Sequence, residues 1–409
     1  MRKLSQITAL LMSICFMEQA AQAATYYVSI SGSDSNNGTE QQAFRTIAKG
    51  LSVMSAGDTL SIRGGTYAER INSGAQTLPT GTSFSNAPII QGYPGEIAIL
   101  KPQMAEVITL ENPSMQYIIF KDLIVDATGV EFGIGITNGA HHIRFQNIEV
   151  KNATKSGVLT TPGSQTYPAD TYLEFLSCSS HDNGITANQD HGFYISTSSN
   201  LIQKSKAYNN AAYGFHIYNG NYPSQTAQNN IVRESQAYNN STRSASSAGI
   251  LLSGGAGNMA YNNIVYGNKH GIGADYYSIG AKIFNNTLYN NTPGYAVTLG
   301  VSSTSANTDI RNNIFWLNGA DIINNGGGAS GTTSSNNLTT NPYFMNVATG
   351  NFQLQPGSPA IDRGLGLPAV LVDFGGVPRP QLNAYDIGAY EYAVSDTVPP
   401  DPPKGLKVQ

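Results

Sequence analysis

The chain has 409 residues, a formal net charge of −4 and only 12% charged residues, whereas glycine occupies 43 positions. This charge disfavours nucleic acid as a ligand, because phosphate binding depends on clustered lysine and arginine. The scarcity of charge also argues against long solvent-exposed helices and is typical of wound extracellular β structures. We therefore expect an all-β protein.

The first 23 residues have the three parts of a secretory signal peptide. Arg2 and Lys3 precede an apolar stretch from Ala9 to Met17, and Ala21-Gln22-Ala23 provides a cleavage site. Cleavage there leaves 20 basic and 25 acidic residues, a net charge of −5, and Cys178 as the one cysteine, so no intrachain disulfide can form. We expect a secreted monomer without a membrane span.

The segment after this leader predicts a cap for the first coil of a β structure. Apolar residues from Ala43 to Leu51 have helical spacing, and they precede a short strand-like run at Gly57 to Ile62. The open end of a β-solenoid would pair with other chains unless something covers it. We therefore expect a short amphipathic helix over the first coil.

Short apolar segments that open on a glycine recur through the middle of the chain. Successive glycines lie 22 to 24 residues apart, except for two intervals of 35 residues. The glycines are Gly133, Gly157, Gly192, Gly214, Gly249, Gly271 and Gly294. Such a period marks a solenoid, because one repeat cannot bury its apolar face without stacking on its neighbours. Alternating runs such as residues 142–150 predict two or three short strands in each coil.

Asparagine recurs at the bend before each glycine strand. The positions are Asn152, Asn183, Asn210, Asn240, Asn268, Asn291 and Asn318. Asparagine tolerates the left-handed backbone of a sharp turn, and stacked asparagines can bond to one another from coil to coil. We interpret these residues as an internal ladder.

The regular period ends near Asn337. The segment from Asn341 to Tyr392 then contains Pro356 to Asp362 and Asp386 to Tyr392, which predict an irregular C-terminal cap. Residues 393–409 are proline-rich and read as a linker or tail, and their last residues are similar to the first strand of a fibronectin type III module. Residues 24–392 are therefore expected to form one domain.

Several of these segments together resemble a known group of proteins. The N-terminal ones are Tyr26-Tyr27-Val28-Ser29, Phe44-Arg45-Thr46-Ile47 and Gly64-Gly65-Thr66-Tyr67, and the C-terminal ones are Ser358-Pro359-Ala360-Ile361-Asp362 and Asp386-Ile387-Gly388-Ala389-Tyr390-Glu391. With the repeats, they resemble the secreted right-handed parallel β-helix proteins of the pectate-lyase-like superfamily, which include polysaccharide lyases. The resemblance implies a right-handed parallel β-helix and a polysaccharide ligand.

The resemblance does not extend to either of two better-defined subfamilies. Of the signatures of pectin hydrolases, only Asn188-Gln189-Asp190 and a partial His191-Gly192 are present. The signatures Trp-x-Asp-His and Arg-x-Pro-x-x-Arg of pectate lyases are absent from the sequence. Fold alone does not fix chemistry, so the site must be argued from its own residues.

Alternation along the glycine strands predicts which side chains leave the core. If Phe193, Ile195, Phe215 and Ile217 point inward, their alternates Tyr194, Ser196, His216 and Tyr218 point to solvent, stacked about 4.8 Å apart from coil to coil. Asp275 extends this row two coils later. Aromatic faces and hydroxyl groups suit sugar rings, so the row predicts a polysaccharide surface. The long segments at residues 161–168 and 219–225 are expected to wall it.

An acidic polysaccharide can be cleaved there by β-elimination, which requires a base, a proton donor and a group that stabilises the enolate. We predict His216 as the base, because histidine titrates near neutral pH, and Tyr194 or Tyr218 as the donor. The expected substrate-binding residues are Asp190, His191, Ser196, Tyr213, Asp275 and Tyr276. The sequence specifies no cofactor, and Ca²⁺ is one option at Asp275.

Other functions stay open at this point. A histidine and two tyrosines on a β surface also form packing ladders, which would favour a non-catalytic adhesin or glycan-binding protein. Epimerisation shares the proton-abstraction step with β-elimination. Hydrolysis needs two carboxylates across the cleaved bond, and the row offers mainly Asp275, with Asp190 distant in the sequence.

Overall fold

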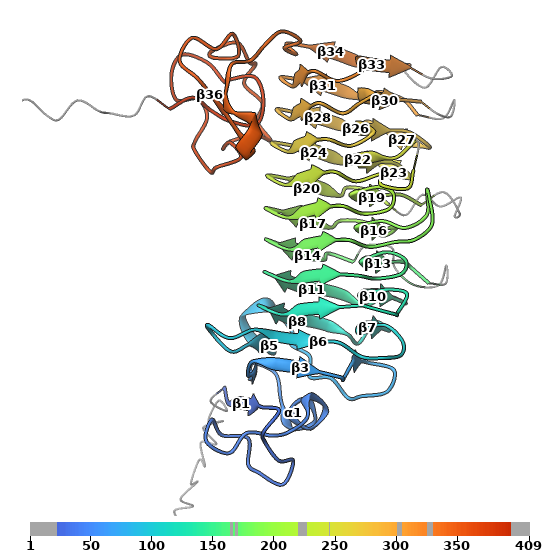
Figure 1. The fold of residues 1–409 in the computed structure, drawn as a ribbon, viewed down its shortest axis with the longest axis vertical. Coiled ribbons are helices and arrows are strands. Elements are labelled where there is room, and N and C mark those ends of the chain that lie inside the picture. The colour runs from blue at the N-terminus through green and yellow to red at the C-terminus, as the bar shows by residue number, and fades with distance from the viewer. Residues whose placement is uncertain are drawn as a thin grey trace, which may run out of the picture.

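The computed structural model describes residues 23–163, 167, 171–219, 227–244, 246–300, 305–324 and 330–393. Within them the chain winds into a solenoid whose coils stack along one axis (Figure 1). Each coil passes through three parallel sheets in turn, sheet A, sheet B and sheet C, with 12, 10 and 10 strands in the described part of the chain. The predicted all-β parallel solenoid is confirmed.

The strands are short, and neighbours within a sheet come from consecutive coils. Sheet A comprises β1 (Thr25–Val28), β2 (Thr59–Ile62), β5 (Ile89–Gly92), β8 (Gln116–Lys121), β11 (His141–Gln146), β14 (Glu174–Leu176), β17 (Leu201–Gln203), β20 (Ile231–Arg233), β24 (Met259–Tyr261), β28 (Lys282–Phe284), β31 (Asp309–Arg311) and β34 (Thr333–Ser335). Sheet B comprises β3 (Gly65–Tyr67), β6 (Ala98–Leu100), β9 (Ile124–Asp126), β12 (Glu149–Lys151), β15 (Ser179–His181), β18 (Lys206–Tyr208), β21 (Gln236–Tyr238), β25 (Ile264–Tyr266), β29 (Thr287–Tyr289) and β32 (Ile314–Trp316). Sheet C comprises β4 (Ile71–Asn72), β7 (Ile108–Glu111), β10 (Ile134–Thr137), β13 (Val158–Thr160), β16 (Phe193–Ile195), β19 (Phe215–Ile217), β22 (Ala248–Leu252), β26 (His270–Ala274), β30 (Tyr295–Leu299) and β33 (Ala320–Asn324). The pairs β23 (Gly255–Ala256) with β27 (Ser278–Ile279) and β35 (Phe344–Asn346) with β36 (Asn351–Leu354), and the 3-10 turns η1 (Phe84–Asn86) and η2 (Val347–Thr349), lie outside these sheets.

A continuous apolar core runs along the inside of the coils. The predicted inward residues of sheet C, including Phe193, Phe215 and Ile250, are fully buried. Phenylalanine rings stack through successive coils of sheet A, with centroids 5.2 Å apart for Phe120 and Phe145 and again for Phe145 and Phe175. The period-2 alternation therefore sorts the side chains as predicted.

The predicted asparagine ladder forms from Asn183 to Asn318. In each step one amide donates to the next asparagine, for example Asn210 Nδ2 to Asn240 Oδ1 at 2.8 Å, and the same oxygen accepts the backbone N–H of Asn210 at 3.3 Å. Asn152 is a correction to the prediction, because its side chain donates outside the ladder to Asp126 Oδ1 at 3.2 Å. Two further ladders were not predicted: Asn200, Asn230 and Asn258, and Asn263, Asn286, Asn313 and Asn337.

The left-handed residue of each bend precedes the ladder asparagine. Asn209, Asn239 and Asn290 have φ of 54°, 52° and 49°, and Gly267 takes this place in another coil. Two different demands therefore fall on neighbouring residues. One must tolerate positive φ, and the next must satisfy buried amides between coils.

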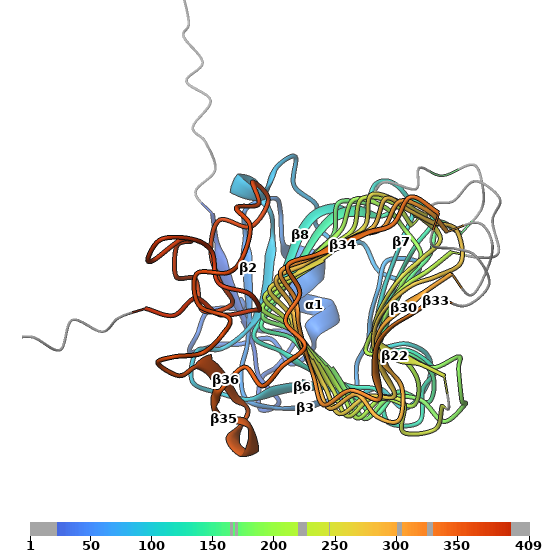
Figure 2. The same ribbon diagram turned by 90° about the horizontal axis from the view of Figure 1, so that it is seen from above.

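The predicted helix covers the first coil, with later bounds than expected. Helix α1 (Ile47–Val53) begins after Thr46, whose side chain accepts a hydrogen bond from the Lys49 N–H at 3.1 Å. Ile47 and Leu51 face the core and are buried. Viewed from above, α1 lies across the mouth of the coils (Figure 2). Residues 43–46 stay outside the helix because Thr46 caps it in an extended conformation.

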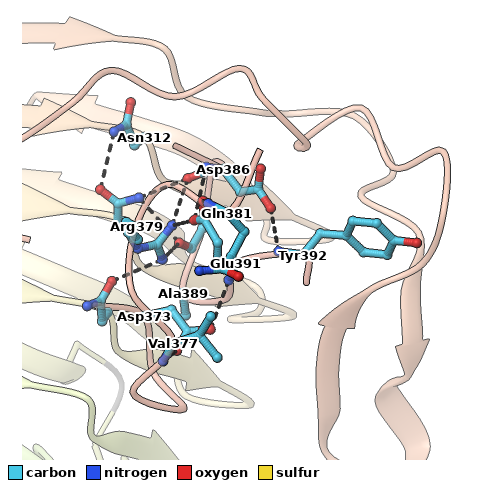
Figure 3. Close-up of polar contacts among 12 residues, drawn as sticks. Asn312, Asp373, Val377, Arg379, Gln381, Asp386, Ala389, Glu391 and Tyr392 are labelled. Atoms are coloured by element: carbon cyan, nitrogen blue, oxygen red, sulfur yellow. Dashed lines mark hydrogen bonds and ion pairs between the residues drawn. The ribbon is translucent and has the colours of Figure 1, made fainter. Parts of the chain in front are cut away.

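The closing segment, residues 341–393, packs against the side of the last coils (Figure 1). Its centre is a buried ion pair between Arg379 Nη1 and Glu391 Oε2 at 2.5 Å (Figure 3). Arg379 Nη2 donates to the Gly388 carbonyl at 2.8 Å and to Asn262 Oδ1 at 3.2 Å, which ties the segment to the solenoid. Buried charges need such pairing, so this cluster fixes the fold of the segment.

Some predictions fall outside the described residues. These are the leader apart from Ala23, most of the two wall segments at residues 161–168 and 219–225, and the tail from residue 394. In the described part of the chain, the helices are too short or too polar to span a bilayer.

Neighbouring asparagines provide a test of the ladder. In Asn240→Ala, the buried N–H of Asn210 and the Ala207 carbonyl lose their partners, and we expect a loss of about 3 kcal/mol in unfolding free energy. Asn239→Gly, one residue earlier, keeps a residue suited to positive φ. It should change the unfolding free energy by under about 1 kcal/mol. Urea unfolding measures both, and equal losses would refute the assignment.

Candidate functional site

The outer row on sheet C exists as the register prediction requires. Tyr194 of β16 pairs with His216 of β19, and His216 pairs with Leu251 of β22. The residues that alternate with them along each strand point inward and are fully buried, so these side chains project from the outer face of the sheet. Residues separated by 22 positions in the sequence therefore lie side by side.

Four rings gather around His216, and together with it they form what we name the aromatic cluster: His191, Tyr194, Tyr213, His216 and Tyr218. Tyr213 and Tyr218 stack on His216 with centroids at 4.5 and 5.0 Å and interplanar angles of 10°. Tyr194 lies at 4.8 Å in the preceding coil, and His191 at 4.0 Å. The cluster thus brings together all three predicted catalytic residues.

The predicted exposure of His216 is wrong. Its exposed fraction is only 6%, because the neighbouring rings cover it. Its Nδ1 is fully buried and has no hydrogen-bond partner among the described residues. Burial, with a smaller contribution from His191, lowers the pKa of His216 well below 6.5. The imidazole is therefore neutral at neutral pH.

His191 and Asp190 serve the bend that leads into β16. The Asp190 carboxylate is buried and accepts the N–H groups of Ile185 and Thr186 at 3.0 and 2.6 Å. His191 Nδ1 accepts the N–H of Tyr213 at 3.3 Å, and burial lowers the pKa of His191 to about 3. Both side chains hold the bend in place, and His191 is also part of the aromatic cluster.

The three tyrosines of the cluster are partly buried and keep their protons. Burial raises the pKa of Tyr194, Tyr213 and Tyr218. Ser196 contributes a hydrogen bond to Tyr194. These phenols therefore stay able to donate a proton over a wide pH range.

The remaining predicted binding residues lie at the edge of the cluster. Tyr276 packs edge-on against Tyr218, with centroids at 5.9 Å, and is 38% exposed. Asp275 is buried, and its Oδ2 accepts the Thr298 hydroxyl at 3.0 Å. Tyr276 can therefore reach a ligand at the surface, whereas Asp275 is buried beneath the surface.

Comparison with known proteins fits this architecture. A family model described as "Pel9A-like, right handed beta helix region" matches residues 26–313. The chain belongs to this Pel9A-like right-handed β-helix family. The handedness expected from the sequence is thereby confirmed.

Solved structures share the fold at low sequence identity. Pectate lyase Pel9A has a TM-score of 0.66 at 17% identity, covering 90% of this chain and 96% of that one. A rhamnogalacturonan lyase has a TM-score of 0.58 at 16% identity, covering 79% and 91%. XylC in complex with xylose has a TM-score of 0.55 at 12% identity, covering 90% and 98%.

One curated relative matches over a shorter region. The uncharacterized protein YwoF of Bacillus subtilis (strain 168) is 29% identical over 143 residues, which are 33% of this chain. The matched region spans 29% of the length of that relative. These likenesses show that the Pel9A-like chain shares the β-helix fold with proteins that include two named polysaccharide lyases.

Metal binding has no obvious place in the described residues. No three His, Cys, Asp or Glu side chains in the described part of the chain come together in a metal-binding arrangement. Asp275 accepts the Thr298 hydroxyl, and the described residues place no cluster of three metal-ligating side chains around it. The described residues of this Pel9A-like protein therefore do not form at Asp275 the carboxylate group in which Ca²⁺ is commonly bound.

A second aromatic row, which the sequence patterns did not predict, lies on sheet B. Tyr208, Tyr238, Tyr266, Tyr289 and Trp316 pair in register through five coils. Tyr208 and Tyr238 stack at 4.9 Å, and Phe352 of the closing segment packs on Tyr266 and Tyr289. The signal was in the sequence, because each of these residues stands two positions before a ladder asparagine.

Burial of the imidazoles predicts a loss of stability in acid. The pKa of His191 is about 3 in the folded protein. Below pH 6.5 the unfolded chain therefore binds more protons than the folded protein, and the free energy of unfolding decreases as the pH falls. For His191 this decrease is about 1.4 kcal/mol per pH unit between about pH 6 and 4. Chemical unfolding of His191→Gln should show a shallower dependence than wild type; identical slopes would contradict burial of a neutral imidazole.

Proposed function

We propose that this Pel9A-like protein is a secreted polysaccharide lyase that binds a uronate-containing glycan over sheet C and cleaves it by β-elimination at the aromatic cluster. The observation that carries the proposal is the contact of one neutral histidine with three protonated tyrosines on the outer face of a β-helix. The family and the fold of the solved lyases support a carbohydrate substrate.

The reaction needs no reagent besides the glycan. His216 takes the proton on C5 of the uronate, and the electrons of that C–H bond form the C4=C5 double bond. The bond between C4 and the glycosidic oxygen breaks, and Tyr194 or Tyr218 gives its proton to the departing oxygen. Proton return from His216 to the tyrosine, directly or through water, restores both groups.

The environment of the cluster sets the two roles apart. Burial lowers the pKa of His216, which keeps the base unprotonated, and raises the pKa of Tyr194 and Tyr218, which keeps the donors protonated. Opposite pKa shifts of two neighbouring groups are typical of a catalytic acid and its base. The carboxylate of a bound uronate would raise the pKa of His216 and strengthen it as a base at the moment of reaction.

The second candidate function is glycan binding without cleavage, as in an adhesin. It is favoured by the low exposure of His216, which lies between the rings of Tyr213 and Tyr218. Under this function the histidine only supports the tyrosines, whose edges and hydroxyls contact the sugar. The two candidates differ in whether an unsaturated product forms.

The test is incubation with alginate, pectate, glucuronan and glycosaminoglycans while the ultraviolet absorbance of the unsaturated product is followed. We expect turnover of one of these polymers and a loss of about 100-fold or more in His216→Gln. Tyr194→Phe and Tyr218→Phe identify the donor, because the true donor loses a comparable factor and the other tyrosine does not.

His270→Gln is the matched control. His270 also lies on sheet C, stacks on Tyr295 at 5.5 Å and accepts its N–H at 3.1 Å, but stands outside the aromatic cluster. Its activity should equal that of wild type. If none of the four polymers yields product while glycan binding is retained in affinity electrophoresis, the lyase function is refuted and the binding function is supported.

The pH profile offers a separate check on the base. Because the pKa of His216 is lowered, its base form persists as the pH falls through 6.5, and kcat/KM should stay constant there. The acid limb should appear only well below pH 6.5. A limb centred at pH 6.5 would mean that the base is solvated and is not His216 in this environment.

A further inference from the structure

Residues with a left-handed backbone are aligned from coil to coil where the chain passes from sheet C to sheet A. Each lies two positions before a residue that pairs in register across β8, β11, β14, β17, β20, β24, β28, β31 and β34, and the first two members already lie inside β8 and β11. We name this alignment the turn column. Its members are Tyr117, His142, Tyr172, Ser199, Asn229, Gly257, Gly280, Asn307 and Gly331, with φ between 48° and 70°.

The composition of the turn column changes abruptly after its third member. From Ser199 onward it holds serine, asparagine and glycine, small residues of which glycine and asparagine suit the left-handed region. Tyr117, His142 and Tyr172 are bulky residues in the same conformation, with φ of 49°, 54° and 48°. A bulky residue at positive φ is an outlier that the backbone alone disfavours, and such outliers gather at functional sites.

The three rings form one continuous stack. The His142 ring lies 4.7 Å from Tyr117 and 4.9 Å from Tyr172, with interplanar angles of 33° and 27°. Phe84 closes the near end edge-on against Tyr117 at 5.4 Å, and the Arg144 guanidinium covers Phe84 at 4.1 Å. The near end of the stack is therefore occupied.

At the far end of the stack, no ring of the described residues covers the outer face of Tyr172. Tyr172 is 48% exposed, and within the described residues its one ring contact is with His142. The next position of the turn column is Ser199, whose side chain is too short to cover a phenol ring. The aromatic row on sheet B differs, because Phe352 of the closing segment covers Tyr266 and Tyr289 there.

We propose that the open face of Tyr172 is a glycan-binding subsite, separate from the aromatic cluster, that stacks on the apolar face of a pyranose ring. Aromatic faces of this kind attract the C–H groups of sugars. The strand before Tyr172, β13, pairs with β16, which carries Tyr194. The subsite thus stands one coil from the proposed site, and it shares with the proposed function only the class of ligand.

The test is native affinity electrophoresis in gels that contain polygalacturonate, alginate or xylan. Wild type should be retarded by at least one of these polymers. Tyr172→Asn removes the ring but keeps a residue suited to positive φ, so the fold should hold while the retardation constant weakens about fivefold or more. Tyr172→Trp, which restores an aromatic face, should recover the retardation.

Tyr343→Asn is the matched control, because Tyr343 is 50% exposed, has φ of 52° and lies in the closing segment. It should migrate as wild type does. Equal retardation of Tyr172→Asn and wild type, or no retardation of wild type by any of the polymers, would overturn the subsite. Retardation is read without cleavage, so a failure of the lyase reaction leaves this result intact, and loss of the subsite leaves the His216 test intact.

Discussion

Parallel stacking imposes one requirement on which every other feature depends, namely partners for the backbone amides buried at the bends between coils. The asparagine ladders supply them, since each side-chain oxygen accepts both a backbone N–H and a side-chain N–H from the coil before. A buried amide without a partner would cost about 1–3 kcal/mol, and a shift of register would orphan a whole ladder. The ladders therefore fix the register, and the register brings Tyr194 beside His216.

The period and the alternation of the sequence were enough to predict the solenoid, the inward residues and the pairing of Tyr194 with His216. They could not predict the burial of His216, because its cover comes partly from Tyr213, a bend residue that follows no alternation. The ladder prediction failed at Asn152 for a related reason. A bend contains two adjacent positions with different demands, and Asn152, with φ of 63°, occupies the left-handed one. Sequence spacing alone does not tell these positions apart.

The closing segment shows how the same turns serve a second purpose. Asparagines at the left-handed positions between sheets A and B donate outward to it: Asn262 to the Val372 carbonyl at 2.6 Å, Asn285 to the Asp386 carbonyl at 3.0 Å and Asn312 to the Leu365 carbonyl at 2.8 Å. Positive φ selects asparagine, and its amide is then free to bind a neighbouring chain. The contacts of the closing segment thus use a residue that the turn already required, and Arg379 adds the buried charge cluster that holds the segment together.

Aromatic rows on a β-helix can be sorted by their backbone conformation and by what covers them. On sheet B the tyrosines lie on regular strands, and part of the row is covered by Phe352, so packing accounts for it. In the turn column, Tyr172 takes a conformation that its side chain disfavours, stacks on His142 and leaves half of its surface open, so packing among the described residues accounts for only one face of its ring. The aromatic cluster stands between these cases, since its strands are regular but its central imidazole keeps a buried nitrogen without a partner among the described residues. Such an unsatisfied group is costly in a structural role and useful in a chemical one, which is why the cluster rather than the sheet B row is the place to look for catalysis.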